Sequence, residues 1–253
     1  MLKQRIIGAI TVLDGWAVQS IGYNRYLPLG RPEVLADNLD RWGADEILIQ
    51  CIDRSKGNSG PDFKTLSKIS SKGITTPLIY AGGIANHHQA IQVIRNGADR
   101  IMLDALMHDA HDVINHASKI LGPQAIIGCI PISIYRNDCF RLNYLTNAKV
   151  KITTQELKKI YSANISELLL VDHDHDGVEN GFDLKILNSD IVNNSPLPLL
   201  FFGGISNPKI AEKVLKHKKT AAVAIGNFLS YQENAIEYFK RNINNTSLRR
   251  HKF

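Results

Sequence analysis

Eight short apolar runs recur along the chain, and each is followed by a polar turn. Their almost continuous apolar character is typical of parallel strands that are buried on both faces. The runs lie at positions 6–12, 46–52, 77–81, 100–103, 125–130, 167–171, 198–202 and 221–225. Helical patterns lie between them at positions 32–42, 63–72, 87–96, 154–162, 208–216 and 231–242. This alternation predicts an α/β fold, a single (β/α)8 TIM barrel, with a doubly wound open sheet as the alternative.

Two glycine turns divide this pattern into similar parts. Gly82-Gly83 and Gly203-Gly204 each follow an apolar run that begins at a proline, and they lie 121 residues apart (203 − 82). The same offset relates further identical pairs: Glu46 and Glu167, Asp53 and Asp174, Gly60 and Gly181, Asp62 and Asp183, Asn86 and Asn207. A fixed offset of this kind indicates duplication of a half-domain. We expect one barrel over 1–253 with halves of about 1–122 and 123–253, because each half alone would leave a sheet edge unpaired.

Two stretches fall outside the alternation. Residues 15–31 make a long loop after the first strand and include Trp16, Tyr23 and Tyr26, which is the composition of a mobile lid. Residues 133–152 carry alternating apolar and polar positions and an Asn-Ala turn. This second pattern predicts a small hairpin inserted after the fifth strand.

The composition is that of an ordinary soluble globular protein, with 44% hydrophobic and 21% charged residues. The formal charge of +6 is modest and no aromatic-basic motif accompanies it, so we expect no nucleic-acid partner. Cys51, Cys129 and Cys139 lack the paired spacing of a disulfide framework or a zinc site. We expect a cytoplasmic location and no membrane partner, because no segment approaches the ~20 apolar residues of a membrane span and no signal-peptide cleavage pattern is found.

The segment 172–176, with the sequence Asp-His-Asp-His-Asp, has the composition of a metal site. In a continuing strand, however, the three aspartates would point to one side and the two histidines to the other, so the five side chains cannot converge. We therefore expect no metal and no cofactor, and instead three carboxylates that line the mouth of the barrel. Asp172 and Asp174 remain candidates to assist a reaction there.

Several short motifs, taken in their order and spacing, resemble the cyclase subunit of imidazole glycerol phosphate synthase, a family of histidine biosynthesis. They are Arg5-Ile6-Ile7, Asp14-Gly15, Gly43-Ala-Asp-Glu46, Gly82-Gly83-Ile84, Gly97-Ala98-Asp99, Asp174-His-Asp176-Gly177 and Gly203-Gly204. The resemblance covers nearly the whole chain and implies a half-duplicated (β/α)8 barrel that binds a glutaminase subunit at its bottom. Ammonia from the glutaminase would pass through the barrel to the C-terminal ends of the strands. There the family's enzyme cleaves a two-phosphate ribonucleotide and forms an imidazole ring.

The chain departs from the family at the positions of catalysis. The family's two catalytic aspartates fall on Thr11 and Pro131, and neither side chain can exchange protons near neutral pH as a carboxylate does. A family lysine falls on Gln19, and a serine before the second glycine turn falls on Phe202. The resemblance therefore implies no confident catalytic residue in this chain.

The resemblance also implies two phosphate sites. In the first, beside Gly82 and Gly83, a family Asn-Thr pair falls on Asp104-Ala105, and a carboxylate there would repel phosphate. The second retains its composition. Its residues are Asp176, Gly177, Gly203, Gly204 and Gly226. We expect an anion or a phosphorylated small molecule at these glycine turns.

Four charged residues each begin a predicted strand and should surround the N-terminal mouth of the barrel: Arg5, Glu46, Arg100 and Glu167. Charges that pair at a barrel's bottom face ordinarily serve stability. The resemblance instead implies the gate through which ammonia enters, with Arg100 in the place of a lysine. It also implies that the neighbouring Asp99 faces the glutaminase.

Three functions remain open at this point. The first is a barrel subunit of a glutaminase heterodimer that conducts ammonia without cyclising, and passes it to a separate sugar amidotransferase that makes an acetamidino sugar for a surface polysaccharide. The second is a working histidine-biosynthesis cyclase, a lyase, with relocated catalytic groups. The third is a scaffold that only activates the glutaminase. Thr11 and Pro131 disfavour the second, whereas the sequence does not separate the first from the third.

Overall fold

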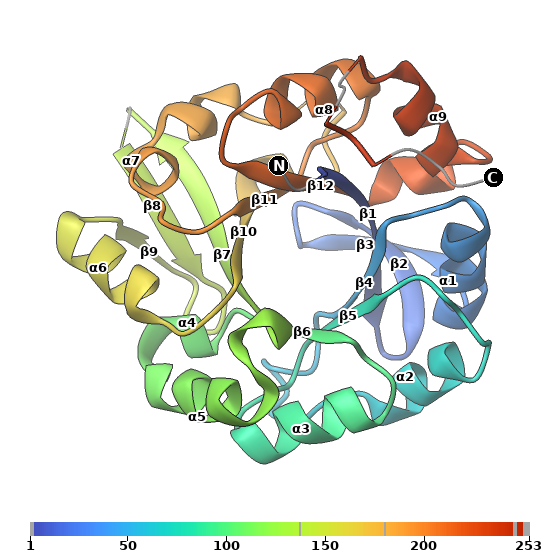
Figure 1. Ribbon diagram of the computed structural model, residues 1–253, viewed down its shortest axis with the longest axis horizontal. Coiled ribbons are helices and arrows are strands. Elements are labelled where there is room, and N and C mark those ends of the chain that lie inside the picture. Colours follow the sequence, from blue (N-terminus) through green and yellow to red (C-terminus); the bar gives the residue numbers. More distant parts are fainter. Residues whose placement is uncertain (1–2, 137, 180, 245–246, 250–253) are drawn as a thin grey trace.

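The computed structural model describes residues 3–136, 138–179, 181–244 and 247–249. Within them, eight parallel strands pair in a closed cycle with helices outside (Figure 1). In order around the cycle these strands are β1 (Arg5–Leu13), β4 (Glu46–Cys51), β5 (Leu78–Ala81), β6 (Arg100–Leu103), β7 (Ile126–Tyr135), β10 (Glu167–Asp172), β11 (Leu199–Phe202) and β12 (Thr220–Ile225). The pairings of β10 with β7 and of β12 with β1 close the cycle. The predicted (β/α)8 barrel is confirmed, and each predicted apolar run is one of its strands.

Helices cover the outside of the sheet (Figure 1). They are α1 (Pro32–Arg41), α2 (Phe63–Ser70), α3 (His87–Arg95), α4 (Leu106–Asp109), α5 (His111–Leu121), α6 (Thr154–Ser162), α7 (Asp190–Asn193), α8 (Pro208–Leu215) and α9 (Ala235–Asn242). Short 3-10 segments lie at η1 (Pro123–Ala125), η2 (His173–His175), η3 (Leu184–Asn188) and η4 (Asn227–Ser230). α5 has no counterpart among the predicted segments. α9 begins later than predicted because Asn234, just before it, has a left-handed backbone with φ of 54°. None of the helices among the described residues is long and apolar enough to cross a membrane.

Residues 15–31 are mostly two paired antiparallel strands, so the prediction of a long loop is wrong here, while a lid role stays a prediction. β2 (Trp16–Ile21) pairs with the end of β1, and β3 (Arg25–Gly30) pairs with β2. The turn between them contains Gly22 and Tyr23, both with positive φ. The middle of β2, residues 17–20, is buried on both faces. The segment therefore lacks the simple alternation that marks a surface strand in a sequence.

Residues 133–152 form the predicted hairpin insertion. β7 continues beyond the barrel, and β8 (Asp138–Asn143) pairs antiparallel with its end. β9 (Ala148–Lys151) then pairs antiparallel with β8. Asn147, immediately before β9, has a φ of 59°, which is a conformation that asparagine tolerates better than most residues. The prediction of a hairpin after the fifth barrel strand is confirmed.

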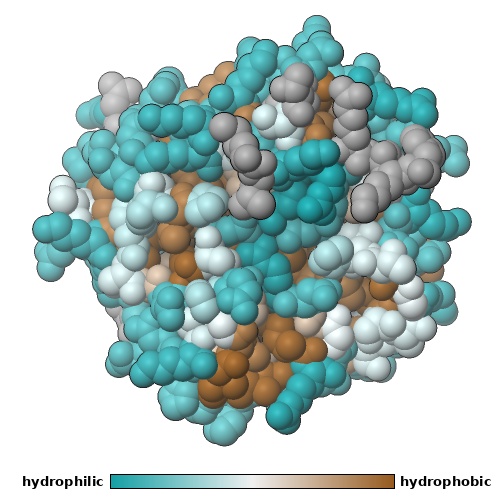
Figure 2. Space-filling view, in the orientation of Figure 1, coloured by the Kyte–Doolittle hydropathy of each residue, from teal (hydrophilic) through white to brown (hydrophobic). Residues whose placement is uncertain are grey.

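Alternate residues of the barrel strands point into the lumen and form one apolar cluster, separate from the larger cluster between sheet and helices. The lumen cluster contains Ile7, Ala9, Leu48, Ile79, Ala81, Met102, Ile127, Cys129, Leu169, Val171, Leu200, Phe202, Ala222 and Ala224. By the same alternation, the charged residue that begins β1, β4, β6 or β10 also points to the axis. In the space-filling view, which has the orientation of Figure 1, hydrophilic residues lie at the centre of the face toward the viewer (Figure 2).

Residues related by the offset of 121 have matching local structure. Asn86 and Asn207 are N-caps of α3 and α8, and each accepts a hydrogen bond from the backbone N–H three residues later. Gly83 and Gly204 have φ values of 70° and 66°. A Cβ on Gly83 would lie 2.3 Å from the carbonyl oxygen of Gly60, and one on Gly204 would lie 2.5 Å from Phe182 N. These equivalences support our proposal that the barrel arose from two halves of about 1–122 and 123–253.

Candidate functional site

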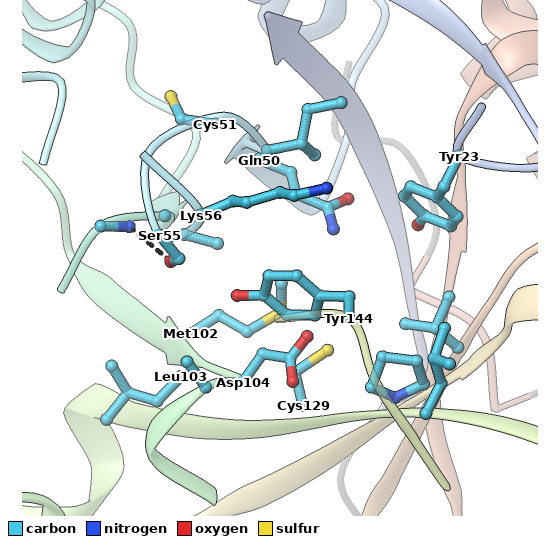
Figure 3. Close-up of a pocket in the computed structure, with 18 of the residues that line it drawn as sticks. Tyr23, Gln50, Cys51, Ser55, Lys56, Met102, Leu103, Asp104, Cys129 and Tyr144 are labelled. Atoms are coloured by element: carbon cyan, nitrogen blue, oxygen red, sulfur yellow. Dashed lines mark hydrogen bonds between the residues drawn. The ribbon is translucent and has the colours of Figure 1, made fainter. Parts of the chain in front are cut away.

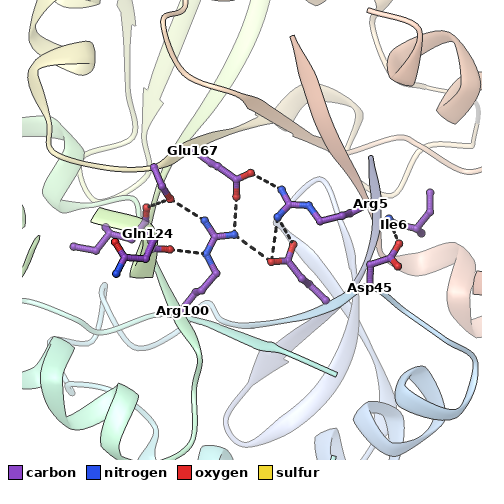
Figure 4. A network of polar contacts seen from close by, with 9 residues as sticks. Arg5, Ile6, Asp45, Arg100, Gln124 and Glu167 are labelled. Carbon is purple, nitrogen blue, oxygen red and sulfur yellow. Dashed lines mark hydrogen bonds and ion pairs between the residues drawn. The ribbon is translucent and has the colours of Figure 1, made fainter. Parts of the chain in front are cut away.

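Four charged side chains close the N-terminal end of the lumen in one ion-paired cycle (Figure 4). Arg5 Nη1 lies 3.3 Å from Glu46 Oε2, and Arg5 Nη2 lies 2.5 Å from Glu167 Oε1. Arg100 Nη1 lies 3.1 Å from Glu46 Oε1 and 2.6 Å from Glu167 Oε2. Each carboxylate therefore bridges both guanidinium groups. We call these four residues the bottom ring, and they are the four that the sequence placed at the gate.

The bottom ring is held in a largely dry environment. Its side chains are between 7% and 16% exposed. Arg100 also donates from Nε to the carbonyl oxygen of Gln124 at 3.1 Å and from Nη2 to Ser166 Oγ at 2.9 Å. Burial raises the pKa of the Glu46 carboxyl, although both guanidinium groups oppose this. The ring is thus a set of desolvated charges whose stability depends on every partner being present.

Asp99 is exposed and immediately precedes Arg100 at the same end of the barrel. Its Oδ2 accepts a hydrogen bond from Leu78 N at 2.8 Å, and its own N–H donates to Leu78 O at 2.9 Å. Asp99 therefore fixes the start of β5. Its predicted contact with a glutaminase stays a prediction, since the structure holds this chain alone.

At the other end of the lumen, the two positions of the family's catalytic aspartates are occupied by residues that cannot replace them. Thr11 is buried on β1, on the same face as Ile7 and Ala9. Pro131 lies on β7 and lines a cavity of about 230 Å³. Gln19, which stands for a family lysine, is buried, and its Nε2 has no hydrogen-bond partner. None of these three side chains can act as a general acid or base near neutral pH, because none gains or loses a proton there.

The cavity that Pro131 lines lies at the C-terminal ends of β4 to β7, and we call it the first cavity. It is walled by both apolar and polar side chains (Figure 3). They include Tyr23, Tyr26, Gln50, Ser55, Lys56, Ile84, Met102, Leu103, Asp104, Tyr144 and His173. Gly82 and Gly83 also line it, but Gly83 N donates to Ser55 Oγ at 3.0 Å. The Gly83 N–H therefore has a partner within the chain, and phosphate binding at Gly82 and Gly83 stays a prediction.

Three buried oxygen atoms of the first cavity have no hydrogen-bond partner. They are Tyr23 Oη, Gln50 Oε1 and Asp104 Oδ1. Burial raises the pKa of Asp104, and it also raises the pKa of Tyr144, to which the Asp104 charge adds. Burial and then the Asp176 carboxylate raise the pKa of Tyr23. Burial is thus the largest cause of the raised pKa at each of these three groups.

Asp104 belongs to a line of buried polar groups that leads away from the first cavity. His108 Nε2 lies 3.6 Å from Asp104 Oδ1, and His108 Nδ1 contacts Arg141 Nη1. Arg141 in turn pairs with Glu156 at 3.1 Å. A guanidinium only donates, so Nδ1 of His108 is the acceptor in this contact. Arg141 comes from β8, so the inserted hairpin is joined to the barrel through this line.

A second cavity, of about 350 Å³, lies at the ends of β10 to β12. Gly203, Gly204 and Gly226 line it, together with Asp176 and Gly177. All five residues of the second predicted phosphate site are thus brought together. Asp176 is already engaged, since its Oδ2 accepts from Ser20 Oγ at 2.6 Å and from Tyr23 N at 3.2 Å. Its role is to hold the β2–β3 hairpin against the top of the barrel.

The predicted arrangement of 172–176 is wrong, because β10 ends at Asp172 and the 3-10 turn η2 breaks the alternation. Asp172 is buried away from the lumen, where it accepts hydrogen bonds from His175 Nδ1 at 2.8 Å and Asp183 N at 2.7 Å. Asp174 is exposed and pairs with Lys149. His173, expected on the opposite side, stacks on Tyr23 in the first cavity. Neither Asp172 nor Asp174 therefore lines either of the two cavities.

Other candidate chemistry is limited in the described part of the chain. No group of three or more His, Cys, Asp or Glu side chains there is arranged to hold a metal ion. Cys51, Cys129 and Cys139 are buried and unpaired, and burial raises their thiol pKa values, so they are poor nucleophiles.

Sequence reasoning missed Gln50, Tyr144, His108 and Arg141. Gln50 could have been found, because the alternation that places Glu46 and Leu48 in the lumen also places Gln50 there. Tyr144 and Arg141 lie in the inserted hairpin, whose position over the barrel no local pattern indicates. His108 lies in α4, a single turn that was not among the predicted helices.

Comparison with known proteins agrees with this geometry. The model of the family "Histidine biosynthesis protein" matches residues 5–235. The chain is 29% identical over 251 residues to the imidazole glycerol phosphate synthase subunit HisF of Staphylococcus epidermidis, covering 95% of this chain and 96% of that protein. It is 26% identical over 243 residues to the HisF subunit of an Exiguobacterium species, covering 95% and 93%. The chain therefore belongs to the histidine biosynthesis protein family, among relatives that are HisF subunits of imidazole glycerol phosphate synthase.

Proposed function

We propose that this protein is the barrel subunit of a glutaminase heterodimer, and that it conducts ammonia without forming the imidazole ring itself. One contrast carries the proposal. At the bottom, all four gate residues are present and joined in one cycle. At the top, Thr11 and Pro131 replace both groups that would move protons.

The lumen between these ends suits a neutral molecule. Its wall is apolar, and several of its residues are small: Ala9, Ala81, Cys129, Ala222 and Ala224. Ammonia is uncharged, so an apolar wall does not impose on it the desolvation cost that an ammonium ion would meet. The bottom ring would have to part for ammonia to enter, because its carboxylates now bridge both guanidinium groups.

The acceptor of the ammonia would be a separate enzyme. We propose a sugar amidotransferase that builds an acetamidino group on a sugar for a surface polysaccharide, as in members of this family that the sequence resembles. The second cavity, with Gly203, Gly204 and Gly226, is our proposed site for a phosphorylated small molecule or another anion. The first cavity differs in that its Gly83 N–H already donates to Ser55 Oγ.

The first test is catalytic. Purified protein supplied with excess ammonia and the family's two-phosphate ribonucleotide is expected to show no imidazole formation. Loss of both proton-transfer groups should cost several orders of magnitude, since each contributes about 10²–10⁴-fold. Turnover at an ordinary enzymatic rate, on the order of 1–10³ per second, would instead establish a working cyclase.

The second test separates conduction from scaffolding. The complex with glutaminase and acceptor enzyme is assayed for free ammonia released against ammonia incorporated. Glu46→Gln is expected to raise this ratio while glutaminase turnover continues, because one side of the bottom ring is then unpaired. Asp138→Asn, which breaks an exposed ion pair with Lys151 on the inserted hairpin, is the matched control and should leave the ratio unchanged. An unchanged ratio in Glu46→Gln would favour the scaffold.

A further inference from the structure

The upper end of the lumen, at the C-terminal ends of the strands, is covered by an aromatic side chain from the β2–β3 turn. Tyr23 packs against the apolar cluster of the lumen. Its hydroxyl group is enclosed by protein atoms, and the residue lines the first cavity (Figure 3). The lumen residues Met102, Cys129 and Val171 line the same cavity. Tyr23 therefore lies where the lumen opens into the first cavity.

The backbone at Tyr23 has an unfavourable conformation. Its φ of 49° lies in the left-handed region, which a bulky residue seldom adopts. Such a conformation persists only where the surrounding structure imposes it. Glycine would adopt the same turn at less cost. The turn itself therefore does not require a tyrosine, and the use of this residue lies in its side chain.

Contacts with the segment that follows β10 hold Tyr23 in place. Tyr23 N and Ser20 Oγ both donate to Asp176 Oδ2, at 3.2 and 2.6 Å. The ring of His173 stacks on that of Tyr23, with 5.5 Å between the centroids and 10° between the planes. Asp176 and His173 belong to one short segment beside η2. A shift of this segment would release the ring without breaking the pairing of β2 with β1.

The route from the lumen to the second cavity is narrowed by Phe202. This side chain belongs to the lumen cluster, lines the second cavity and is 5% exposed. Its ring lies so close to Gly226 that a Cβ on that glycine would be 3.1 Å away from it. Phe202 is held on the strand β11, whereas Tyr23 is held on a turn. The first cavity is therefore the favoured outlet.

The two ends of the lumen are closed in different ways. The bottom ring closes the lower end with ion pairs, and Tyr23 covers the upper end with an aromatic ring. We infer that Tyr23 is an upper gate, which separates the lumen from the first cavity until the β2–β3 turn moves aside. For ammonia this rests on the proposed function. Ammonia that enters at the bottom ring would stay in the lumen until the upper gate opens.

The closure is tested on the isolated full-length chain through its own cysteines. Cys129 lies in the lumen beside the first cavity and is 1% exposed. Cys139 lies outside the lumen, in the cluster between sheet and helices, and serves as the internal control. Methyl methanethiosulfonate, a small neutral thiol reagent, is added to the native protein. Peptide mass spectrometry then measures the rate of modification at each cysteine.

Four variants locate the gate. Tyr23→Ala is expected to raise the rate at Cys129 by about tenfold or more, because modification of a buried group follows the equilibrium of local opening. The rate at Cys139 should not change. Tyr23→Phe keeps the ring and should react as the original protein does, whereas Ser20→Ala loses one hydrogen bond that holds the turn and should give a smaller rise. Tyr135→Ala, which removes an exposed tyrosine at the end of β7, is the matched control and should change neither rate.

Three results would overturn the inference. They are an unchanged rate at Cys129 in Tyr23→Ala, an equal rise in Tyr23→Phe, and an equal rise at Cys139, which would indicate general loosening of the fold. If Tyr23→Ala does not fold, an unchanged rate at Cys129 in Ser20→Ala overturns it in the same way. Ammonia transfer is not measured in this experiment. Failure of conduction therefore leaves the closure standing, and failure of the closure leaves a conduit that is open at its upper end.

Discussion

Glu46 and Glu167, which lie 121 residues apart in the sequence, bridge the same two guanidinium groups at the bottom of the barrel. Glu167 places one oxygen against Arg5 and the other against Arg100, whereas Glu46 Oε1 accepts a hydrogen bond from both arginines. The two acidic residues come from β4 and β10, which are not neighbours in the sheet. The bottom ring therefore closes the lumen and also links, by ion pairs across the barrel axis, strands that are far apart in the sequence.

The first prediction concerns the stability of this ring. Glu46→Gln leaves one side of both arginines unpaired in a desolvated place, and is expected to lower the free energy of unfolding by about 3 kcal/mol. Chemical denaturation of the isolated chain measures this. Asp138→Asn, from an exposed pair, should change the free energy by less than about 1 kcal/mol. Equal effects of the two substitutions would contradict a buried, interdependent ring.

The second prediction tests the glutaminase interface at Asp99. Asp99→Lys is expected to weaken association with the glutaminase and to change its salt dependence, because like charge would replace a complementary one. Asp99 also accepts a hydrogen bond from Leu78 N, so the substitution alone would mix interface and fold effects. Asp99→Asn retains an acceptor there and is the matched control. Calorimetric titration at low and high salt decides, and unchanged binding of Asp99→Lys would place the interface elsewhere.

The third prediction compares two glycines with the same backbone conformation. Gly83 and Gly73 have φ values of 70° and 71°, but a Cβ on Gly73 meets nothing within 4 Å. Both alanine substitutions should cost about 1–2 kcal/mol for the left-handed conformation. Gly83→Ala should cost about 1–3 kcal/mol more, because its Cβ would lie 2.3 Å from the carbonyl oxygen of Gly60. Equal thermal stability of the two variants would show that the backbone at Gly60 and Gly83 can separate to make room for the added Cβ.

The fourth prediction is a pH dependence at Asp40 in α1. Burial acts to raise the pKa of this carboxyl, but hydrogen bonds from Thr76 and Thr75 outweigh it and the pKa lies below its usual value. A carboxyl with a lowered folded-state pKa stabilises the fold above the unfolded pKa of about 3.9, and this stabilisation is lost as the pH falls through the folded pKa. Asp40→Asn should therefore be less stable than the original at neutral pH, by about 1–2 kcal/mol.

The difference between Asp40→Asn and the original protein should shrink as the pH falls below about 4. Melting temperatures measured from neutral to acidic pH would show this convergence. Asp37→Asn, from an exposed pair with Arg41 on the same helix, should follow the original curve closely. A constant gap between Asp40→Asn and the original at every pH would mean that the ionised carboxylate is not the stabilising form.

The strands of the barrel could be predicted because their signals are local. The turn at 97–99 stops the preceding helix, and the apolar run that follows begins at Arg100 and ends at Leu103, which are the bounds of β6. The bottom ring could be predicted for the same reason, since a strand's first residue and its alternation determine where the side chain points. The predicted bounds of the outer helices agree less well with the structure. At α9, for example, the left-handed Asn234 delays the start of the helix.

The top of the barrel could not be predicted to the same extent. The direction of Asp172 depends on hydrogen bonds from His175 and Asp183, which exist only once the chain turns at η2. Tyr144 reaches the first cavity because the inserted hairpin folds back over the barrel. Contacts of this kind depend on tertiary structure, and no periodicity in the sequence encodes them.

The bottom ring also makes the proposed halves of the barrel unequal in charge. Residues 1–122 contribute Arg5, Glu46 and Arg100, whereas residues 123–253 contribute Glu167 alone. Two copies of the first half would bring four arginines and two glutamates to the axis, and two copies of the second would bring two glutamates. Only the mixed pair is neutral there. If the barrel did arise by duplication, the changes at these charged positions would have disfavoured pairing between two identical halves. They would also have favoured pairing of each half with the other.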